Sequence, residues 1–189
     1  KEIEPEALQN SKYIYIEGYL VSSPGGLRAM KRAKKLAEHY GVKTALTFSD
    51  PNMIMFFREG VDEVIGGSVD LLFCNEDEAF TYTDTDNIND AREELKKVAK
   101  RFVITQGKNG AMIFDGDTFI DIEPYPVKAV DTNGAGDMYA GAFLYGITHG
   151  YSFAQAGKLA RLASSRVVSQ FGPRLENGAA EQILDELFY

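Results

Sequence analysis

Hydrophobic and polar positions along the chain follow two different periods. Short runs rich in β-branched and aromatic residues predict strands at 12–21, 42–48, 71–74, 101–105, 111–114, 118–122 and 127–130. Longer segments with apolar residues at helical spacing predict helices at 27–40, 53–60, 90–100, 134–149, 152–170 and 179–187, with a further helix starting at Glu76. Strands that alternate with helices favour an α/β fold with a largely parallel sheet.

The chain shows no repeat, low-complexity tract or internal linker, so residues 1–189 are expected to form a single domain. It begins with Lys1 instead of methionine, and residues 1–10 read as a polar helix tail that leads into a strand. We therefore expect this sequence to be part of a longer chain.

Composition narrows the class of protein. A net charge of -8 without a basic cluster argues against a nucleic-acid partner. No run approaches the ~18 apolar residues of a membrane span. The single cysteine, Cys74, cannot form an internal disulfide, and no signal peptide is visible, so a cytoplasmic location is expected.

The strongest local signal is the segment Asp131–Asp137, which reads DTNGAGD and precedes a helix. Gly134 and Gly136 allow a tight turn and a close approach to a ligand. The free N–H groups and positive dipole end of the helix that they open form an anion site. The chain has no P-loop motif, and it lacks the acidic residue about 20 positions later that a dinucleotide site needs.

Asp137 gives this anion site its chemistry. A carboxylate inside a resting phosphate site would repel the phosphate, whereas an acid that faces an acceptor hydroxyl suits phosphoryl transfer. The amides at Gly134–Gly136 would stabilise charge on the moving group. The residues alone equally allow Asp137 to be a first-turn acid on a buried helix.

Two further motifs allow two interpretations each. Asn75 and Glu78 fit a helix N-cap with its capping-box glutamate, and they also fit a magnesium–phosphate site after a buried strand. The segment Thr105–Gly110 fits an ordinary hairpin turn or a nucleotide contact. Cys74 is interpreted as a small buried apolar residue.

The DTNGAGD segment followed by Met138–Phe143 resembles the C-terminal signature of the ribokinase/PfkB family of carbohydrate and nucleoside kinases. Other segments occur in family order: Gly18-Tyr19, Ser49-Asp50-Pro51, Asn75–Glu78, Thr105–Gly110 and Phe171–Arg174. The resemblance is strongest to the bacterial adenosine kinase and sugar kinase branch. It implies a three-layer α-β-α ribokinase-like fold that lacks the N-terminal strands and lid in this chain.

The resemblance implies an enzyme that phosphorylates the primary hydroxyl of a nucleoside, with adenosine as the first candidate. Asp137 would be the catalytic base, and Gly134, Ala135 and Gly136 would form the anion hole. One alternative is a sugar kinase for ribose, fructose or a related sugar. The other is a non-catalytic, nucleotide-binding regulator on the kinase fold.

The resemblance also implies the ligands and their positions. ATP would be bound at Asn75, Thr105, Gly107, Gly110, Arg161 and Ser164. Mg2+ would be organised by Glu78, partly through water. A monovalent cation such as K+ would lie at five positions, several acting through backbone carbonyls: Asp131, Asn133, Val167, Gln170 and Gly172. The acceptor would approach Gly18, Asp50 and Asn52, and the absent lid would form a homodimer contact.

Overall fold

The computed structural model describes residues 3–188. Its internal contacts divide the chain into two compact units, Lys1–Ile104 and Thr105–Tyr189, and each unit is described by itself. The expectation of a single domain stays a prediction. Among the described residues, no helix combines the length and the apolar character that crossing a bilayer requires.

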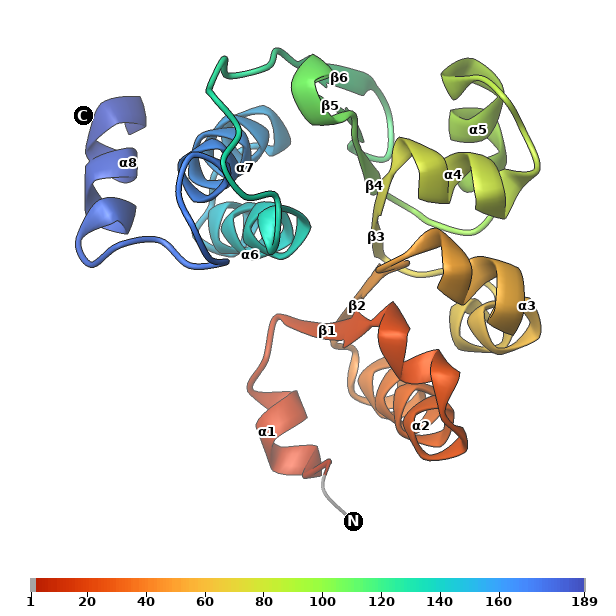
Figure 1. The fold of residues 1–189 in the computed structure, drawn as a ribbon. Helices are drawn as coiled ribbons and strands as arrows, with labels where there is room; N and C mark the ends of the chain where they lie inside the picture. Colours follow the sequence, from red (N-terminus) through yellow and green to blue (C-terminus); the bar gives the residue numbers. More distant parts are fainter. Residues whose placement is uncertain (1–2, 189) are drawn as a thin grey trace. The chain divides into compact units, whose positions relative to one another are not determined.

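The first unit alternates strands with helices (Figure 1). Its strands, hydrogen-bonded in this order, are β1 (Tyr13–Glu17), β2 (Lys43–Thr47), β3 (Leu71–Asn75) and β4 (Phe102–Thr105). Its helices are α1 (Pro5–Gln9), the 3-10 helix η1 (Gly18–Ser22), α2 (Pro24–Tyr40), α3 (Pro51–Ile65), α4 (Glu76–Thr83) and α5 (Ile88–Leu95). The pairs β1–β2 and β2–β3 are parallel, so the carboxyl ends of these three strands share one edge of the sheet.

Burial explains why these strands lack strict alternation. Residues 71–74 of β3 are all buried, as are the three central residues of β2. Strands covered on both faces read as continuous apolar runs, which is typical of parallel sheets. Cys74 is buried in this core, which confirms its interpretation as an apolar residue.

The second unit is a β-hairpin with three helices. Its elements are the 3-10 helix η2 (Gly107–Asn109), the antiparallel strands β5 (Ala111–Phe114) and β6 (Phe119–Ile122), and the helices α6 (Ala135–Thr148), α7 (Phe153–Val168) and α8 (Ala179–Phe188). The helices α6 and α7 run antiparallel, and they approach so closely that a Cβ at Gly146 would lie 2.8 Å from the Cβ of Ala156. Gly157 gives α7 a similar close approach to the hairpin.

Helix ends follow the predicted signals in several places. Gly41 ends α2 with φ 70°, as expected for a C-terminal glycine. Ser152 begins α7 with a capping box that Gln155 completes. His39 lies in the last turn of α2, and His149 is the C-cap residue of α6.

Two strand predictions were wrong in part or in full. The run 12–21 is a strand only to Glu17, and the chain then turns into η1. The turn brings Gly18 against the end of β2, where a Cβ would lie 2.5 Å from the carbonyl oxygens of Thr47 and Phe48. No strand forms at 127–130. Here the chain is exposed, and the Val130 N–H donates to a carbonyl at the end of α7 instead of to a neighbouring strand.

Two helices differ in extent from the prediction. The helix expected at 53–60 is α3, which begins at Pro51 and continues to Ile65 through a kink at Phe57 (φ -130°, ψ 30°). The helix expected at 90–100 ends at Leu95. Its apolar tail leaves the helix because the backbone of residues 98–100 pairs with Val69 next to β3.

Candidate active site

The first turn of α6 has no side-chain cap. Its N-cap is Gly134 in the left-handed region (φ 75°). The N–H of Ala135 donates to the carbonyl of Thr132 at 3.2 Å. The structure gives the N–H groups of Gly136 and Asp137 no acceptor among residues 3–188. These two donors and the positive end of the helix dipole together form a site suited to an anion.

Two independent features of position 134 require glycine. A positive φ is unfavourable for residues with a Cβ. In addition, a Cβ at this position would lie 2.4 Å from the Cβ and 2.9 Å from the Cα of Pro173. The predicted glycine turn is therefore held by contact with a residue 39 positions later, for which the sequence predicts no role.

Asp137 occupies the third position of α6 and is exposed. The opposite side of the same helix carries Tyr139 and Phe143, which are buried, as is expected of core residues. The carboxylate of Asp137 makes no cap to its own helix start among the described residues. It is thus open to a ligand, while its catalytic role stays a prediction.

Asp131 connects the glycine turn to the segment after α7. One carboxylate oxygen accepts the N–H of Asn133 at 2.9 Å, and the other accepts the N–H of Gly172 at 3.1 Å. These two hydrogen bonds favour the ionised form and lower the pKa of Asp131. The structure therefore brings together three of the positions predicted for a monovalent cation.

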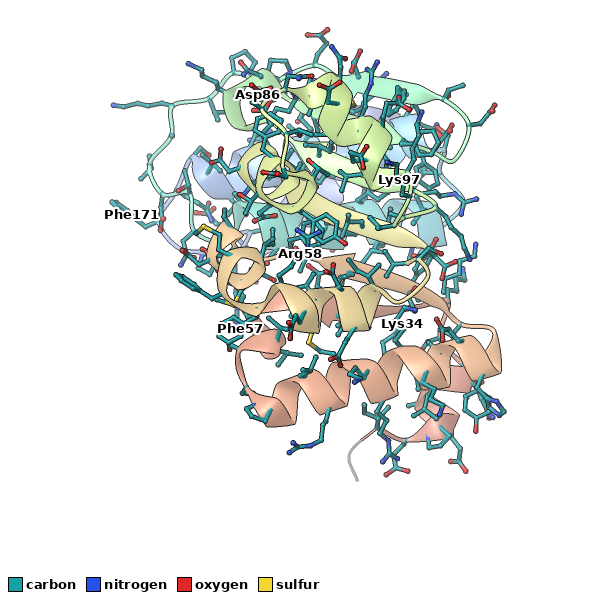
Figure 2. All side chains as sticks on the ribbon, turned by 90° about the vertical axis from the view of Figure 1, so that its right-hand side faces the viewer. Lys34, Phe57, Arg58, Asp86, Lys97 and Phe171 are labelled. Atoms are coloured by element: carbon teal, nitrogen blue, oxygen red, sulfur yellow. The ribbon has the colours of Figure 1, made fainter. Side chains whose placement is uncertain are left out.

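Beside Gly172 lies Phe171, an aromatic side chain that is 86% exposed and points outward (Figure 2). The next turn is fixed by the side-chain amide of Gln170, which donates to the carbonyl of Arg174 at 2.6 Å. Phe171 opens the Phe171–Arg174 motif, but no role is predicted for it from the sequence. An aromatic residue placed directly before Gly-Pro was the available signal, because such loop positions are rarely core.

Two predicted nucleotide residues on α7 contact their own unit. The Arg161 guanidinium donates to the carbonyl of Glu123 at 3.0 Å and lies over the ring of Tyr125. The hydroxyl of Ser164 donates to the carbonyl of Ala135 at 2.9 Å, in the first turn of α6. The Arg161 Nε and the Tyr139 hydroxyl are buried without a partner among the described residues.

The turn Thr105–Gly110 fits its hairpin interpretation. The N–H of Gln106 donates to the carbonyl of Gly110 at 2.9 Å, and η2 forms between them. Gly107 and Gly110 have positive φ, and a Cβ at Gly110 would lie 2.0 Å from the carbonyl oxygen of Ile122. The positive φ explains Gly107, and the positive φ together with close packing explains Gly110. Nucleotide contact at this turn stays a prediction.

In the first unit, Asn75 and Glu78 form a complete capping box at the start of α4. The Asn75 side-chain oxygen accepts the Glu78 N–H at 2.8 Å, and the Glu78 carboxylate accepts the Asn75 N–H at 3.0 Å. The structure thus confirms the capping interpretation. Burial, with help from the carboxylates of Asp50 and Asp77, raises the pKa of Glu78 to about 7, although the Asn75 N–H opposes this shift.

The fit of Glu78 to magnesium depends on water. Both of its oxygens already accept hydrogen bonds, the second from the Asn75 side-chain amide at 2.9 Å. Within residues 3–188, no three His, Cys, Asp or Glu side chains are grouped as metal ligands. Mg2+ usually keeps several waters and binds few protein carboxylates. A water-mediated contact at Glu78 suits this donor set, whereas direct multidentate binding does not.

The residues predicted for the acceptor side follow the carboxyl ends of two neighbouring parallel strands. Gly18 follows β1, and Asp50 follows β2. One oxygen of the Asp50 carboxylate accepts both the backbone and side-chain N–H groups of Asn52, at 2.7 Å each. Asp50 thereby caps α3, and its other oxygen remains available at this edge.

Comparison with known proteins identifies the class of protein that this fold and glycine turn define. The model of the family described as "pfkB family carbohydrate kinase" matches residues 2–178. The chain belongs to the pfkB family of carbohydrate kinases. This confirms the resemblance stated above.

Among individual proteins, the chain is similar to the adenosine kinase of Sinorhizobium meliloti, with a TM-score of 0.92 and 32% identity over 98% of the chain. It is equally similar to a probable sugar kinase of Rhizobium etli, with a TM-score of 0.91 and 32% identity. Adenosine kinase 1 of Arabidopsis thaliana is 28% identical over 184 residues, 87% of this chain. These likenesses confirm the predicted α/β ribokinase-like fold.

The chain spans only part of these relatives. It covers 57% of each of the two bacterial structures, the second likewise over 98% of this chain, and 52% of the plant protein. The activity, substrates and partners of the whole protein are therefore proposals.

Proposed function

We propose that the whole protein transfers the γ-phosphoryl group of ATP to the primary hydroxyl of a nucleoside, with adenosine as the first acceptor to test. The observation that carries this proposal is the first turn of α6. It combines N–H donors without acceptors and an exposed carboxylate at Asp137. Such a turn can stabilise a moving phosphoryl group and position the attacking hydroxyl at the same time.

In the proposed reaction, the acceptor oxygen forms a bond to the γ-phosphorus while the bond from that phosphorus to the bridging oxygen of ADP breaks. Asp137 accepts the proton of the acceptor hydroxyl. The N–H groups of Gly134 and Gly136 in the predicted anion hole, together with that of Asp137, would stabilise negative charge on the equatorial oxygens. Ala135 is left out of this set because its N–H already donates to the carbonyl of Thr132. Because phosphoryl transfer is loose, the main contributions are positioning and charge stabilisation.

The nucleotide side of the proposal keeps the residues that the sequence predicts. Glu78 would bind Mg2+ through water, with Asn75 beside it, because both oxygens of this single carboxylate already accept hydrogen bonds. Thr105, Gly107, Gly110 and Arg161 would border ATP. Asp131, Asn133 and Gly172 would hold a monovalent cation, and the hydrogen bonds from the last two to Asp131 support their proximity.

The acceptor is the least constrained part of the proposal. Likeness at 32% identity extends both to an adenosine kinase and to a probable sugar kinase. A sugar kinase for ribose, fructose or a related sugar is therefore the second candidate. A cytoplasmic location and a homodimer stay predictions.

The test is an acceptor panel with the full-length protein that contains this chain, read by ADP release in the presence of Mg2+. We expect turnover with adenosine to exceed turnover with ribose and fructose. A hexose as the better acceptor would replace the nucleoside proposal with the sugar kinase. Nucleotide binding without turnover on any acceptor would favour the non-catalytic regulator.

A further inference from the structure

The hydroxyl of Ser164 makes a contact that links α7 to the first turn of α6. It donates to the carbonyl oxygen of Ala135 at 2.9 Å, across 29 residues of sequence. An α-helical carbonyl uses one lone pair for the N–H four residues later and keeps a second one. The Ser164 hydroxyl occupies that second position.

The carbonyl of Ala135 and the N–H of Gly136 belong to the same peptide group. A hydrogen bond to the oxygen of an amide polarises the group and strengthens its N–H as a donor, because hydrogen bonds in a chain reinforce one another. The Gly136 N–H is one of the two donors in this turn without an acceptor among the described residues. The Ser164 hydroxyl therefore acts on the Gly136 N–H through the carbonyl at the other end of the same peptide group.

From these contacts we propose that Ser164 is a positioning residue that strengthens and orients the Gly136 N–H of the anion hole. This inference rests on the proposed function. It assigns the Ser164 hydroxyl to the backbone of α6, in place of the nucleotide contact expected from the sequence.

The remaining supports of the turn do not depend on Ser164. Pro173 packs against Gly134, and Asp131 binds the N–H groups of Asn133 and Gly172. Because these contacts persist in its absence, loss of the Ser164 hydroxyl weakens one donor without unfolding the turn. Complete removal of an anion-hole donor costs about 10²–10³ in turnover. Polarisation changes a hydrogen bond by about 10–30%, so the expected loss is roughly two- to eightfold.

The neighbouring residue supplies a matched control. The hydroxyl of Ser165 also donates to a backbone carbonyl, that of Leu162 at 2.7 Å, but this bond stays within α7. Ser164→Ala and Ser165→Ala thus each remove one hydroxyl from the same helix. Only the first removes a bond to α6.

The experiment compares both variants and Ser164→Thr in the full-length protein with Mg2+, ATP and the best acceptor of the panel. We expect Ser164→Ala to lower kcat roughly two- to eightfold with the KM for ATP unchanged, Ser165→Ala to retain kcat, and Ser164→Thr to restore it. A raised KM for ATP at unchanged kcat would assign Ser164 to the nucleotide and overturn the proposal. Equal losses of kcat in both alanine variants would also overturn it.

A second readout does not need activity. In ¹⁵N-labelled protein, Ser164→Ala should shift the amide resonance of Gly136 more than that of Asp137, and Ser165→Ala should leave both in place. No shift at Gly136 would contradict the inference even if the enzyme is active. If the Gly136 resonance shifts as expected but the wild-type protein is inactive, the proposed function is contradicted and the contact between Ser164 and Gly136 is not.

Discussion

Two of the helix starts in residues 3–188, those of α4 and α6, carry an acidic residue at the same position and use it in different ways. In α4, Glu78 is the third helical residue, is 5% exposed and folds back onto the N-cap Asn75. In α6, Asp137 is also the third residue, but it is exposed and follows a glycine N-cap with no side chain to cap the helix. The first acid closes its helix end, whereas the second leaves N–H donors and a carboxylate open to a ligand.

The comparison shows that the N-cap residue decides what the third-position acid does. An asparagine cap accepts the N–H of the third helical residue and recruits the acid at that position as its partner. A left-handed glycine cap offers no acceptor, and at Gly134 packing against Pro173 prevents any larger residue. A first-turn acid is therefore a candidate for chemistry when its helix start is uncapped.

The largest expected effect comes from Gly134→Ala. The new Cβ meets Pro173 and a positive φ, so the turn must shift. We expect a turnover loss of about 10²-fold or more, in the range found for anion-hole donors, and a loss of about 1–3 kcal/mol in the free energy of unfolding. ADP release and denaturant unfolding of the full-length protein measure these two quantities.

Gly141→Ala is the control for this change, because nothing lies within 4 Å of a Cβ at that position of the same helix. Alanine there should be neutral or stabilise by about 0.5–1 kcal/mol. Equal turnover losses in both variants would show that the glycine turn has no special role.

A smaller effect is expected from pH at Glu78. Its pKa of about 7 in the folded state lies above the ordinary glutamate value, so the folded state binds more protons between these two values. This group's contribution to stability is therefore present at low pH and is lost as pH rises towards and through 7. Between pH 5 and 8 this loss should lower the free energy of unfolding by on the order of 2 kcal/mol. The Glu78→Gln side chain stays neutral, so this variant should not show the loss.

The measurement is the free energy of unfolding between pH 5 and 8 in buffer without Mg2+, with Asp77→Asn as the control for the loss of one nearby charge. Asp77 is an exposed acid in the same turn, so its substitution should change the slope less. Identical slopes for wild type and Glu78→Gln would mean that Glu78 titrates normally.

The smallest expected effect is a difference in the free energy of unfolding between alanine variants of the two acids. Glu78→Ala leaves the N–H and side-chain amide of Asn75 without their acceptor and should cost about 1 kcal/mol. Asp137→Ala removes an exposed side chain with no cap to its helix start and should change stability by less than about 0.5 kcal/mol. Denaturant unfolding of both variants tests the difference, and a larger loss for Asp137→Ala would reverse the assignment.

Local signals in the sequence predicted much of this contrast. The capping box at Asn75 and the helix that opens at Gly134 depend on residues within a few positions of each other, which fixed spacing reveals. The alternation of strands and helices likewise predicted the α/β class, because periodicity reports which face is buried.

Contacts between distant residues could not be predicted. The packing of Pro173 on Gly134 and the bond from Ser164 to Ala135 join positions 39 and 29 residues apart, and no spacing rule encodes them. The expected strand at 127–130 failed for the same reason. Its β-branched residues fit a strand. The Val130 N–H, however, donates to the carbonyl of Val168 at the end of α7 and not to a neighbouring strand.

In the proposed mechanism, Asp137, the exposed acid of the uncapped turn, accepts the proton of the acceptor hydroxyl. The most direct measurement is the turnover of Asp137→Asn in the full-length protein at saturating ATP and acceptor, together with its affinity for ATP. We predict a loss of about 100-fold or more in kcat with ATP binding within about twofold of wild type. Unchanged kcat would contradict the claim and remove Asp137 from the mechanism.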